Sequence, residues 1–480
     1  MHYDVIIIGC GVVGAACAYA LSGYQLRLGI LEASNDVANG TTKANSAIVH
    51  GGYDPLPGTK MARLNVVGNA MFPELCRRLD VPFQKTGSLV VSLSQEDDAV
   101  LEELLRQGRE NRVPGLRLLS AEEARSMEPN LSPEVRGALY APSAGIVNPW
   151  ELCLAMAETA VKNGAELHLS APVTAVERCE AGYLLRTPKG DFTARYVLNC
   201  AGVTSDRVAN LVGDHSFHIR PNKGEYFLLD KSEGTRVGRV IFQCPTKVGK
   251  GVLVAPTVHG NLLVGPNAAP TCPGDTANSA DGLAFVRASA QRAVPGINFR
   301  ENIRNFAGVR ANSDRDDFII EESRVAPGFI HLAGIRSPGL TAAPAIGIEA
   351  LELLKKAGLS LQKKAEFVDS RRRIRFHELS DEEKNELIRQ DPRWGRVICR
   401  CETVTEGEIV AALHCPIPPV SVNGVKRRVG AGMGRCQGGF CGPRVQEILA
   451  RELGLDPTQI PMDWEGTWVL CGETKGGAKA

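Results

Sequence analysis

The sequence predicts an α/β protein with a discontinuous Rossmann-like domain, an α+β domain and a small C-terminal domain. The chain opens with a strand, a glycine-rich turn and a helix, "YDVIIIGCGVVGAACAYAL". Two later stretches, "ARYVLNCAGVTSDRVANLVG" and "GFIHLAGIRSPGLTAAPAIGIEALELLKKAG", repeat this order of strand, loop and helix. Between them the chain has short alternating strands such as "GEYFLLD", which are typical of an α+β domain. Four cysteines then form two close pairs near the C-terminus.

Length and composition limit the classes of protein that need to be considered. At 480 residues and 44% hydrophobic content, the chain can build two or three cores. The 55 basic and 54 acidic residues leave a net charge of +1, which excludes a general attraction to nucleic acid or to an anionic membrane. The apolar start, Val5 to Leu21, lacks a basic leader and is too short to span a bilayer. We therefore expect a cytoplasmic protein that reaches a membrane only through a partner.

We place the domain boundaries where the composition and the predicted elements change. The predicted cofactor domain covers 1–80, 141–210 and 310–360, and the α+β substrate domain covers 81–140 and 211–309. A charged linker, 361–395, then leads to a small domain at 396–455 and a tail at 456–480.

The first glycine turn has the spacing of a dinucleotide-binding fingerprint. Gly9, Gly11 and Gly14 follow a strand and open a helix, and Glu32 ends the next strand eighteen residues after Gly14. These glycines allow a tight turn, close approach of the backbone to a pyrophosphate, and packing of helix on strand. Glu32 can accept hydrogen bonds from ribose hydroxyls, so the start of the chain predicts a dinucleotide site.

Four separated motifs together resemble the FAD-dependent oxidoreductases of the D-amino-acid oxidase and glycerol-3-phosphate dehydrogenase superfamily. They are the fingerprint, "TTKANSAIVHGGY", "VLNCAGVTSD" and "HLAGIRSPGLTAAPAIG". The resemblance implies that the cofactor is FAD. It further implies flavin contacts from Thr41, Thr42 and Ser46, adenine contact from Val173, and pyrophosphate contact from Ala201 and Gly202. It places the stretch that contains Gly334, Gly339, Leu340 and Thr341 at the pyrimidine edge of the ring, where amide donors would stabilise the reduced flavin.

The same resemblance implies a small anionic substrate and suggests which residues contact it. Arginine can hold phosphate or carboxylate with two hydrogen bonds, and histidine can take a proton near neutral pH. Arg310, in "AGVR", is the first candidate for the anion, with Lys223 and Arg336 as further contacts. His50 is the candidate base. The alternatives are that His50 only packs on the flavin, that Lys223 is a surface residue, and that Arg336 pairs with an acidic neighbour.

The terminal cysteines predict a metal site. One residue separates Cys399 from Cys401, thirty-four separate the two pairs, and four separate Cys436 from Cys441. This spacing departs from that of zinc fingers, and the surrounding glycines offer amides to sulfur, so a [2Fe–2S] cluster is favoured over zinc or redox thiols. The stretch "ICRCETVTEGEI…GMGRCQGGFCGPRVQEIL" resembles the bacterioferritin-associated-ferredoxin-like [2Fe–2S] domain. Joined to a flavin domain, it resembles the large subunits of anaerobic glycerol-3-phosphate dehydrogenases.

These resemblances imply an FAD-dependent dehydrogenase that oxidises sn-glycerol 3-phosphate to dihydroxyacetone phosphate. Its electrons would pass through the [2Fe–2S] cluster to an acceptor protein or subunit, or to a quinone pathway, because an enzyme that reduces oxygen directly needs no cluster. Two alternatives stay open. One is an L-2-hydroxyglutarate-like hydroxy acid or an amino acid as the substrate, and the other is a self-sufficient flavoenzyme with a zinc-bearing interaction module.

Overall fold

The computed structural model describes residues 1–245 and 251–472. The chain divides into two compact units, each with its own hydrophobic core. The larger unit contains Met1–Ala33 and Val37–Arg371, and the smaller contains Ser34–Asp36 and the chain from Arg372 onward. The division after Arg371 falls within the stretch that the sequence predicts as a linker.

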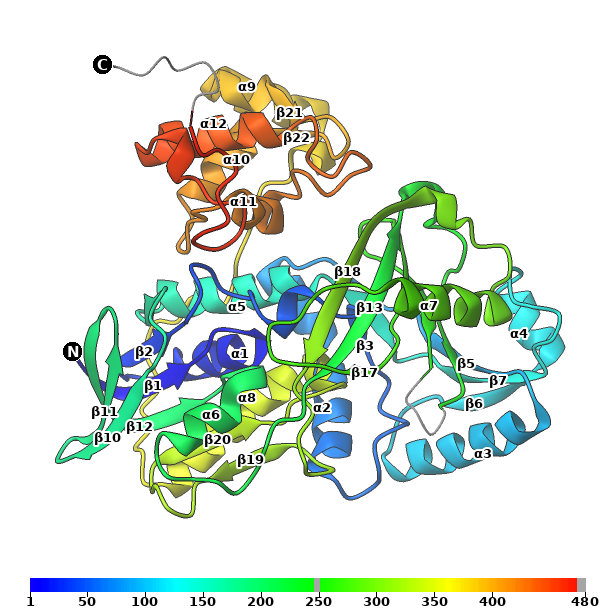
Figure 1. Ribbon diagram of the computed structural model, residues 1–480, viewed down its shortest axis with the longest axis horizontal. Coiled ribbons are helices and arrows are strands. Elements are labelled where there is room, and N and C mark those ends of the chain that lie inside the picture. Colours follow the sequence, from blue (N-terminus) through cyan, green and yellow to red (C-terminus); the bar gives the residue numbers. More distant parts are fainter. Residues whose placement is uncertain (246–250, 473–480) are drawn as a thin grey trace. The chain divides into compact units, whose positions relative to one another are not determined.

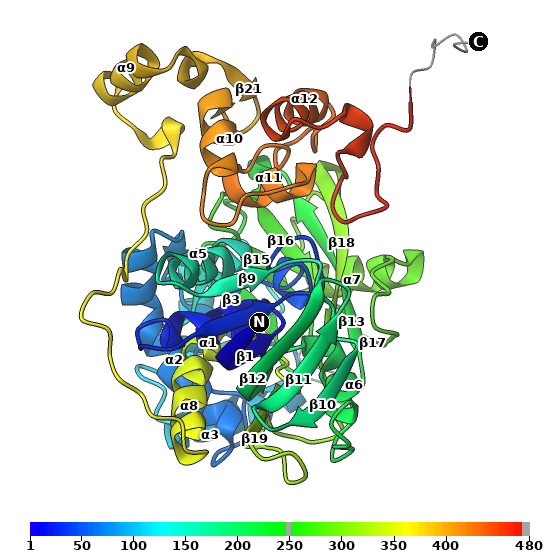
Figure 2. The same ribbon diagram turned by 90° about the vertical axis from the view of Figure 1, so that its left-hand side faces the viewer.

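An eight-stranded sheet forms the α/β part of the larger unit (Figures 1 and 2). Its central strands are parallel, in the order β9, β2, β1, β12 and β20, and an antiparallel hairpin of β10 and β11 extends it beside β12. The strand bounds are β1 (His2–Ile8), β2 (Leu28–Leu31), β9 (Glu166–His168), β10 (Ala175–Cys179), β11 (Gly182–Thr187), β12 (Gly190–Asn199), β19 (Ile319–Glu322) and β20 (Phe329–Ala333). Strands from three distant stretches thus build one sheet, as predicted for a discontinuous Rossmann-like domain.

Helices α1 (Val12–Leu21), α6 (Ser205–Asn210) and α8 (Gly339–Lys356) follow strands β1, β12 and β20 and pack against the sheet. Two further helices, α2 (Lys60–Leu79) and α5 (Pro149–Lys162), belong to the same part of the unit. Helix α1 packs against both α5 and α8, and α2 packs against α8. Gly68 of α2 allows close contact there, since a side chain at this position would overlap the backbone oxygen of Thr341.

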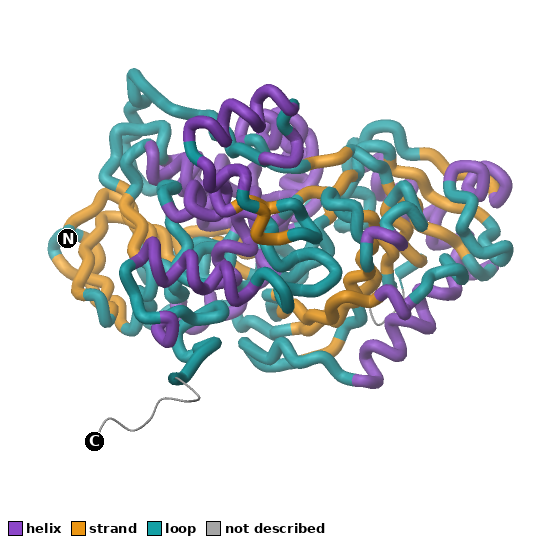
Figure 3. The backbone as a smooth tube through the Cα atoms, turned by 90° about the horizontal axis from the view of Figure 1, so that it is seen from above, coloured by secondary structure: helices purple, strands orange, loops and turns teal. Residues whose placement is uncertain are grey.

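A nine-stranded, mostly antiparallel sheet forms the other part of the larger unit. In Figure 3 its strands make a second group, separate from the group beside the N-terminus. Its members are β5 (Ser88–Ser92), β6 (Arg117–Ser120), β7 (Gly137–Ala141), β13 (Asn222–Leu229), β14 (Val240–Gln243), β15 (Leu253–Pro256), β16 (Leu262–Gly265), β17 (Ala269–Pro270) and β18 (Asn302–Arg310). Helices α3 (Gln95–Glu110), α4 (Ala121–Met127) and α7 (Ala280–Ala293) accompany them. A three-stranded sheet of β3 (Ile48–Val49), β8 (Gly145–Val147) and β4 (Phe83–Gln84) completes this unit.

The smaller unit is mainly helical. It contains α9 (Asp381–Gln390), α10 (Glu406–Leu413), α11 (Val422–Val429) and α12 (Gly442–Leu453), with the two short strands β21 (Val397–Cys399) and β22 (Val404–Thr405). Two of the four predicted metal ligands, Cys399 and Cys441, belong to its apolar core. The predicted tail continues as a short turn held by a bridge between Pro461 and Trp468, and its last residues, 473–480, lie outside the described residues.

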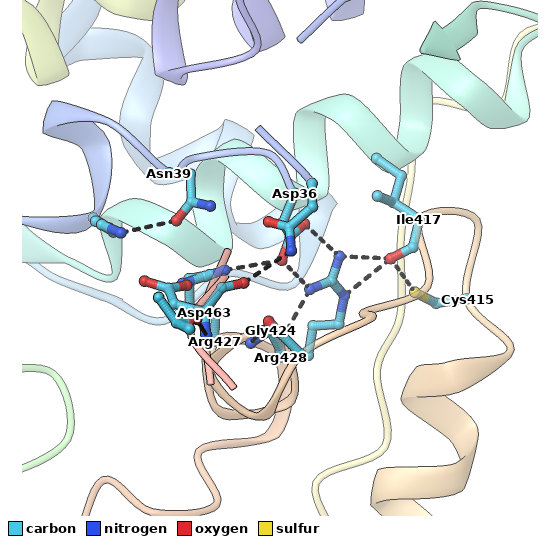
Figure 4. A network of polar contacts seen from close by, with 12 residues as sticks. Asp36, Asn39, Cys415, Ile417, Gly424, Arg427, Arg428 and Asp463 are labelled. Carbon is cyan, nitrogen blue, oxygen red and sulfur yellow. Dashed lines mark hydrogen bonds and ion pairs between the residues drawn. The ribbon is translucent and has the colours of Figure 1, made fainter. Parts of the chain in front are cut away.

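A buried ion network holds the smaller unit together (Figure 4). Both nitrogens of the Arg428 fork donate to Asp36, at 2.8 and 2.9 Å, and Arg427 donates to Asp36 at 3.1 Å and to Asp463 at 2.9 Å. Burial alone would raise the pKa of Asp36, but the charges and hydrogen bonds of Arg428 and Arg427 outweigh it and lower that pKa. All four side chains are buried or nearly so, and each can stay charged because the opposite charge of its partners offsets the loss of hydration.

Throughout residues 1–245 and 251–472, no helix combines the length and the apolarity that crossing a membrane requires.

Candidate active site and cluster site

The glycine turn lies where strand β1 passes into helix α1. Gly9 has φ +93°, and a Cβ there would lie 2.7 Å from the backbone oxygen of Cys200. A side chain at Gly14 would overlap the backbone oxygen of Gly9. The turn can therefore be built only with glycine at these two positions, because backbone atoms cannot yield as a flexible side chain can.

Predicted cofactor residues from other segments meet this turn. The backbone N–H of Cys10 donates to Glu32 Oε2 at 2.7 Å, and that of Val12 donates to Thr42 Oγ1 at 3.0 Å. Ala201 lies against Gly9, with its Cα 3.3 Å from where a Gly9 Cβ would be. Val173 packs on the same apolar cluster as Ala201, and Gly202 begins the turn into α6 with φ +56°.

The loop before helix α8 lies beside His50. The Thr341 Oγ1 atom accepts a hydrogen bond from the His50 N–H at 2.9 Å, and His50 Nε2 lies 3.2 Å from Ser337 Oγ. Gly334 has φ +64°, Gly339 starts the helix after Pro338, and Leu340 is half-buried in its first turn. The predicted base and the predicted flavin-edge segment are thus joined by direct hydrogen bonds.

Helix α2 also fixes the His50 backbone. The side-chain amides of Asn65 and Asn69 both donate to the His50 carbonyl oxygen, at 3.1 and 3.0 Å. The sequence reasoning missed these two residues. Their spacing of four within one helix, which puts two amides on one face, is the signal that could have pointed to a shared target.

The His50 side chain lines a cavity of about 490 Å³. Its other walls include Tyr53, Phe242 and Gln243, and the His50 and Phe242 rings lie 5.8 Å apart. Among the described residues the lining contains Asp54 and Glu103 but no lysine or arginine. The described walls of this cavity therefore supply no cation for the anionic group of a substrate.

The predicted anion-binding residues Lys223 and Arg310 lie together on the neighbouring strands β13 and β18. Asn222 pairs with Arg310 in the ladder, and Asn222 Oδ1 accepts from the guanidinium at 2.7 Å. Arg310 also donates to the Asn267 carbonyl, at 3.2 Å. Lys223 Nζ is 3.0 Å from Asp275 and is largely buried, so it is an ion-paired residue of a strand. Arg336 Nη2 donates to the backbone oxygen of Asp316 at 2.8 Å.

The strand that carries Arg310 also meets the predicted flavin segment. Thr41 Oγ1 donates to the backbone oxygen of Val309 at 2.6 Å, and Gly308 packs directly on Ala44. Ser46 Oγ lies 3.1 Å from the Tyr226 hydroxyl of β13. Segments distant in sequence therefore converge around residues 41–50.

The four terminal cysteines form two pairs, each with one member from either motif. The Cys401 and Cys436 sulfurs lie 3.8 Å apart, and Cys399 hydrogen-bonds to Cys441. Cys399 and Cys441 are almost fully buried, whereas Cys401 and Cys436 are exposed. Among the described residues no three or more His, Cys, Asp or Glu side chains are placed to hold a single metal ion. Two pairs suit a binuclear cluster, which divides four thiolates between two irons.

Hydrogen bonds lower the pKa of Cys399 and of Cys436, whereas the hydrogen bond to Cys399 and burial raise the pKa of Cys441. The Cys441 hydrogen bond and the amides of Gly432 and Glu402 lower the pKa of Cys399 to about 6 against the effect of burial. Amides of Phe440 and Gly438 lower the pKa of Cys436. A side chain at Gly434 would overlap Cys401, so the glycines keep the loops close to the sulfurs. Thiolates with amide donors are the ligands that iron–sulfur clusters use.

Comparison with known proteins assigns both sites to families. Residues 4–353 match the family model described as FAD dependent oxidoreductase, which covers more than half of the chain. The chain belongs to the FAD-dependent oxidoreductase family. Residues 397–451 of this oxidoreductase match the BFD-like [2Fe-2S] binding domain. The predictions of the fold class and of both cofactors, FAD and a [2Fe–2S] cluster, are thereby confirmed, and a zinc module is not supported.

The relatives of this FAD-dependent oxidoreductase include a protein of nearly the same length. It is 51% identical to a glycerol 3-phosphate dehydrogenase of Caloramator mitchellensis over 98% of this chain and 99% of the relative. It is 32% identical to a glycerol 3-phosphate oxidase of Mycoplasma genitalium over 75% of this chain and 96% of the relative. The solved L-α-glycerophosphate oxidase of Mycoplasma pneumoniae, with FAD bound, is similar at 31% identity and a TM-score of 0.74, covering 77% of this chain and 98% of that one.

Three helix N-termini in this oxidoreductase fit its two cofactors. Among the described helices of eight or more residues, α1, α8 and α12 alone lack a cap from the side chain of their own N-cap residue, and the others begin at a capping Ser, Thr or Asn. Helix α1 starts at the glycine turn, α8 at the predicted flavin edge, and α12 directly after Cys441. The Asn39 Nδ2 atom, next to the predicted flavin segment, is buried without a hydrogen-bond partner among the described residues. Uncapped amides and an unpaired donor are what bound FAD phosphates and a cluster would satisfy.

Proposed function

We propose that this enzyme oxidises sn-glycerol 3-phosphate to dihydroxyacetone phosphate and delivers the electrons through its [2Fe–2S] domain to a partner protein. The observation that carries the proposal is the 51% identity, over almost the whole chain, to a glycerol 3-phosphate dehydrogenase that is as long as this chain. A glycerol 3-phosphate oxidase aligns over only 75% of this chain, and the cluster domain lies in the part of the chain near the C-terminus. A cluster is of use when the electrons leave one at a time.

In this proposal His50 receives the proton of the substrate hydroxyl. Its backbone is fixed on both sides, by Thr341 at the N–H and by the two asparagines of α2 at the carbonyl. Its Nε2 lies beside Ser337 Oγ, and its ring forms part of a cavity wall. A fixed backbone holds the imidazole in one orientation, which a general base requires. When bound, FAD accepts the two electrons and the hydrogen that leave the carbinol carbon.

The anionic end of the substrate would be met by Arg310, with Lys223 and Arg336 as further contacts. The hydrogen bonds of Arg310 to Asn222 and Asn267 leave part of its planar fork for a phosphate. Lys223 is held by Asp275, which reduces the charge that it can offer. Of the three cations, Arg310 therefore has the strongest support.

A substrate panel tests the choice of substrate. The anaerobic holoenzyme is mixed with glycerol 3-phosphate, L-2-hydroxyglutarate or a secondary amino acid, and bleaching of the flavin is recorded. Glycerol 3-phosphate is expected to bleach it fastest. If it fails while a hydroxy acid or an amino acid succeeds, the substrate assignment is wrong and the family membership stands.

A second experiment tests His50. His50→Asn is expected to lower the rate of flavin bleaching about 100-fold or more at neutral pH and to remove the acidic limb of the pH profile. If the rate falls equally at every pH and the limb stays, His50 only packs beside the flavin.

The electron path has its own test. Glycerol 3-phosphate should reduce the cluster as well as the flavin, which EPR of the frozen, substrate-reduced protein detects. If the substrate reduces the flavin but leaves the cluster oxidised, and dithionite does reduce the cluster, the proposed electron path is wrong.

A further inference from the structure

The acceptors that the described residues offer to the Arg310 guanidinium are all neutral. Its Nη1 atom donates to Asn222 Oδ1 at 2.7 Å and to the Lys223 backbone oxygen at 3.3 Å, and its Nη2 atom donates to the Asn267 backbone oxygen at 3.2 Å. The Lys223 side chain, in contrast, is paired with the carboxylate of Asp275 at 3.0 Å. A guanidinium has five N–H donors, so these three bonds leave Arg310 with its charge and two donors for an anion.

The guanidinium also lies against the neighbouring strand. In the ladder of β13 and β18, Asn222 pairs with Arg310 and Gly224 pairs with Gly308. A Cβ at Gly224 would overlap the Arg310 guanidinium and would lie 2.7 Å from the Cβ of Pro266. The missing side chain of Gly224 therefore provides the space that the guanidinium occupies.

The loop residue that accepts from Arg310 is itself fixed at its side chain. Asn267 Oδ1 accepts a hydrogen bond from the Glu225 N–H at 2.8 Å, and Asn267 Nδ2 donates to the Glu225 carboxylate. Because the backbone N–H can only donate, the amide oxygen must face it, and the amide nitrogen then faces the carboxylate. Two hydrogen bonds to one residue thus hold Asn267, whose backbone oxygen lies beside Arg310.

Glu225 is a buried carboxylate whose described partners are neutral donors. It is 1% exposed, and it accepts from the Ser279 N–H and from Ser279 Oγ as well as from Asn267. Ser279 caps helix α7, so the carboxylate lies at the positive end of a fourteen-residue helix. A buried charge requires such donors. The negative charge is thereby stabilised one asparagine away from Arg310, without pairing with it.

We propose that Glu225 and Asn267 are positioning residues that hold the Arg310 guanidinium unpaired for the anionic group of the substrate. The inference rests on the proposed function, in which Arg310 meets that group. A carboxylate paired directly with Arg310 would orient it too, but would compete with the substrate anion for the same donors. A neutral oxygen that a buried carboxylate holds in place gives the orientation without the competition. The arrangement therefore favours anionic substrates over neutral alcohols.

Rapid mixing of the anaerobic holoenzyme with glycerol 3-phosphate tests this arrangement. The bleaching of the flavin gives a half-saturating concentration and a limiting rate. Asn267→Ala should raise the half-saturating concentration about tenfold and change the limiting rate less than about twofold, because it weakens the binding of the anion and not the reaction at the carbinol carbon. In Arg310→Met the same substitution should add less than about twofold, because no guanidinium is left to position.

An exchange of the two side chains separates positioning from packing. Asn267→Asp places two carboxylates face to face and should raise the half-saturating concentration about tenfold or more. In Glu225→Gln/Asn267→Asp the amide and the carboxylate trade places, so the concentration should return to within about threefold of that of the unmodified enzyme.

A second variant serves if the exchange at the buried Glu225 does not fold. Asn222→Ala removes another acceptor of Arg310 and leaves the buried carboxylate in place. It should raise the half-saturating concentration about threefold, again only while Arg310 is present.

A matched control lies at the other end of β13. The buried Asn261 amide donates to the Leu229 backbone oxygen at 3.0 Å, so Asn261→Ala removes a comparable hydrogen bond from the same strand. This substitution should lower the midpoint of unfolding but leave the half-saturating concentration within about twofold.

The proposal is wrong if Asn267→Ala lowers the limiting rate at an unchanged half-saturating concentration, or if its effect is as large without the Arg310 guanidinium. It is also wrong if the exchanged pair performs no better than Asn267→Asp alone. If only a hydroxy acid or an amino acid bleaches the flavin, the same series is run with that anion, and the expected changes would uphold the positioning role while the proposed substrate fails. If Arg310→Met itself leaves the half-saturating concentration of glycerol 3-phosphate unchanged, this inference fails while the substrate stands.

Discussion

The predicted flavin site and the cluster site would each hold a cofactor, but their residues are brought together in different ways. The predicted flavin residues come from stretches between Gly9 and Thr341, and they meet through hydrogen bonds and close backbone contacts. The cluster cysteines come from two loops between Cys399 and Cys441. The first site depends on the tertiary fold of the large unit. The second depends on two short loops and leaves one pair of its cysteines in solvent. The contrast shows that the predicted flavin site is assembled from distant segments of the fold, whereas the cluster site needs only two short loops and leaves two of its cysteines accessible.

The largest effect is expected from a side chain added at the tightly packed glycine turn of the predicted flavin site. In Gly14→Val the new side chain would overlap the Gly9 carbonyl, so flavin content per protein should fall about tenfold or more. Iron and sulfide content should stay near that of the unmodified protein, because the cluster loops belong to the other unit. Gly40→Ala is the matched control, since its Cβ would meet nothing within 4 Å. Joint loss of both cofactors would show that the two sites are not independent.

The next effect concerns the ion network of the smaller unit. Asp36→Asn would leave the buried Arg428 without its carboxylate, which should cost about 3–5 kcal/mol of stability. Denaturant unfolding followed by cluster absorbance measures this loss. Asp381→Asn, at a position that is 91% exposed, should change the same midpoint by less than about 0.5 kcal/mol. Equal effects of the two substitutions would mean that the network does not stabilise this unit.

The same network predicts a pH dependence. Burial opposes the ionised form of Asp36, yet Arg428 and Arg427 lower its pKa in the folded protein. A carboxylate with a lowered pKa stabilises the fold fully above its unfolded pKa of about 3.9 and loses that contribution as the pH falls toward the folded value. The stability gap between the unmodified protein and Asp36→Asn should therefore be constant above about pH 5 and narrow below pH 4. Thermal unfolding at a series of pH values checks this, and a gap that widens in acid would contradict it.

A smaller effect should separate the two kinds of cluster cysteine. Cys399→Ser places a hydroxyl in the apolar core and should destabilise the unit by about 1–3 kcal/mol. Cys401→Ser changes an exposed side chain and should leave the fold within about 0.5 kcal/mol, although it removes a ligand too. Unfolding of the two iron-free variants by urea gives the difference directly. Similar values would mean that the buried and exposed pairs contribute alike to the fold.

The smallest effect is expected at the Thr42 hydroxyl. Thr42→Val keeps the shape of the side chain but removes the acceptor for the Val12 N–H at the start of α1. We expect a loss of about 1 kcal/mol, seen as a roughly fivefold rise in the Kd for FAD. Binding of FAD to the apoprotein, followed by fluorescence, measures this rise. No change would indicate that the bound cofactor can take over that amide.

Much of the cofactor chemistry follows from local sequence. Gly9, Gly11 and Gly14 indicate their role by spacing alone, because a turn this tight admits few residue types. The spacing of the two cysteine pairs likewise predicts the cluster, because the spacing of ligands within a loop limits which metal group they can bind. The contacts of Lys223 and Arg310, in contrast, could not be predicted from local sequence. The hydrogen bond of Arg310 to Asn222 comes from strand pairing, and the ion pair of Lys223 with Asp275 comes from a loop fifty-two residues away, and no local pattern predicts either contact.

The sequence by itself determined the α/β class and both cofactors, because glycine turns and paired cysteines act over a few positions. Only the tertiary structure decided how Asn65 and Asn69 fix the backbone of His50, that Asp36 is bound by Arg427 and Arg428, and that Cys401 and Cys436 rather than Cys399 and Cys441 face solvent. The physical reason is that burial and long-range hydrogen bonding depend on which distant segments pack together. That packing is a property of the whole fold, which no single stretch of sequence contains.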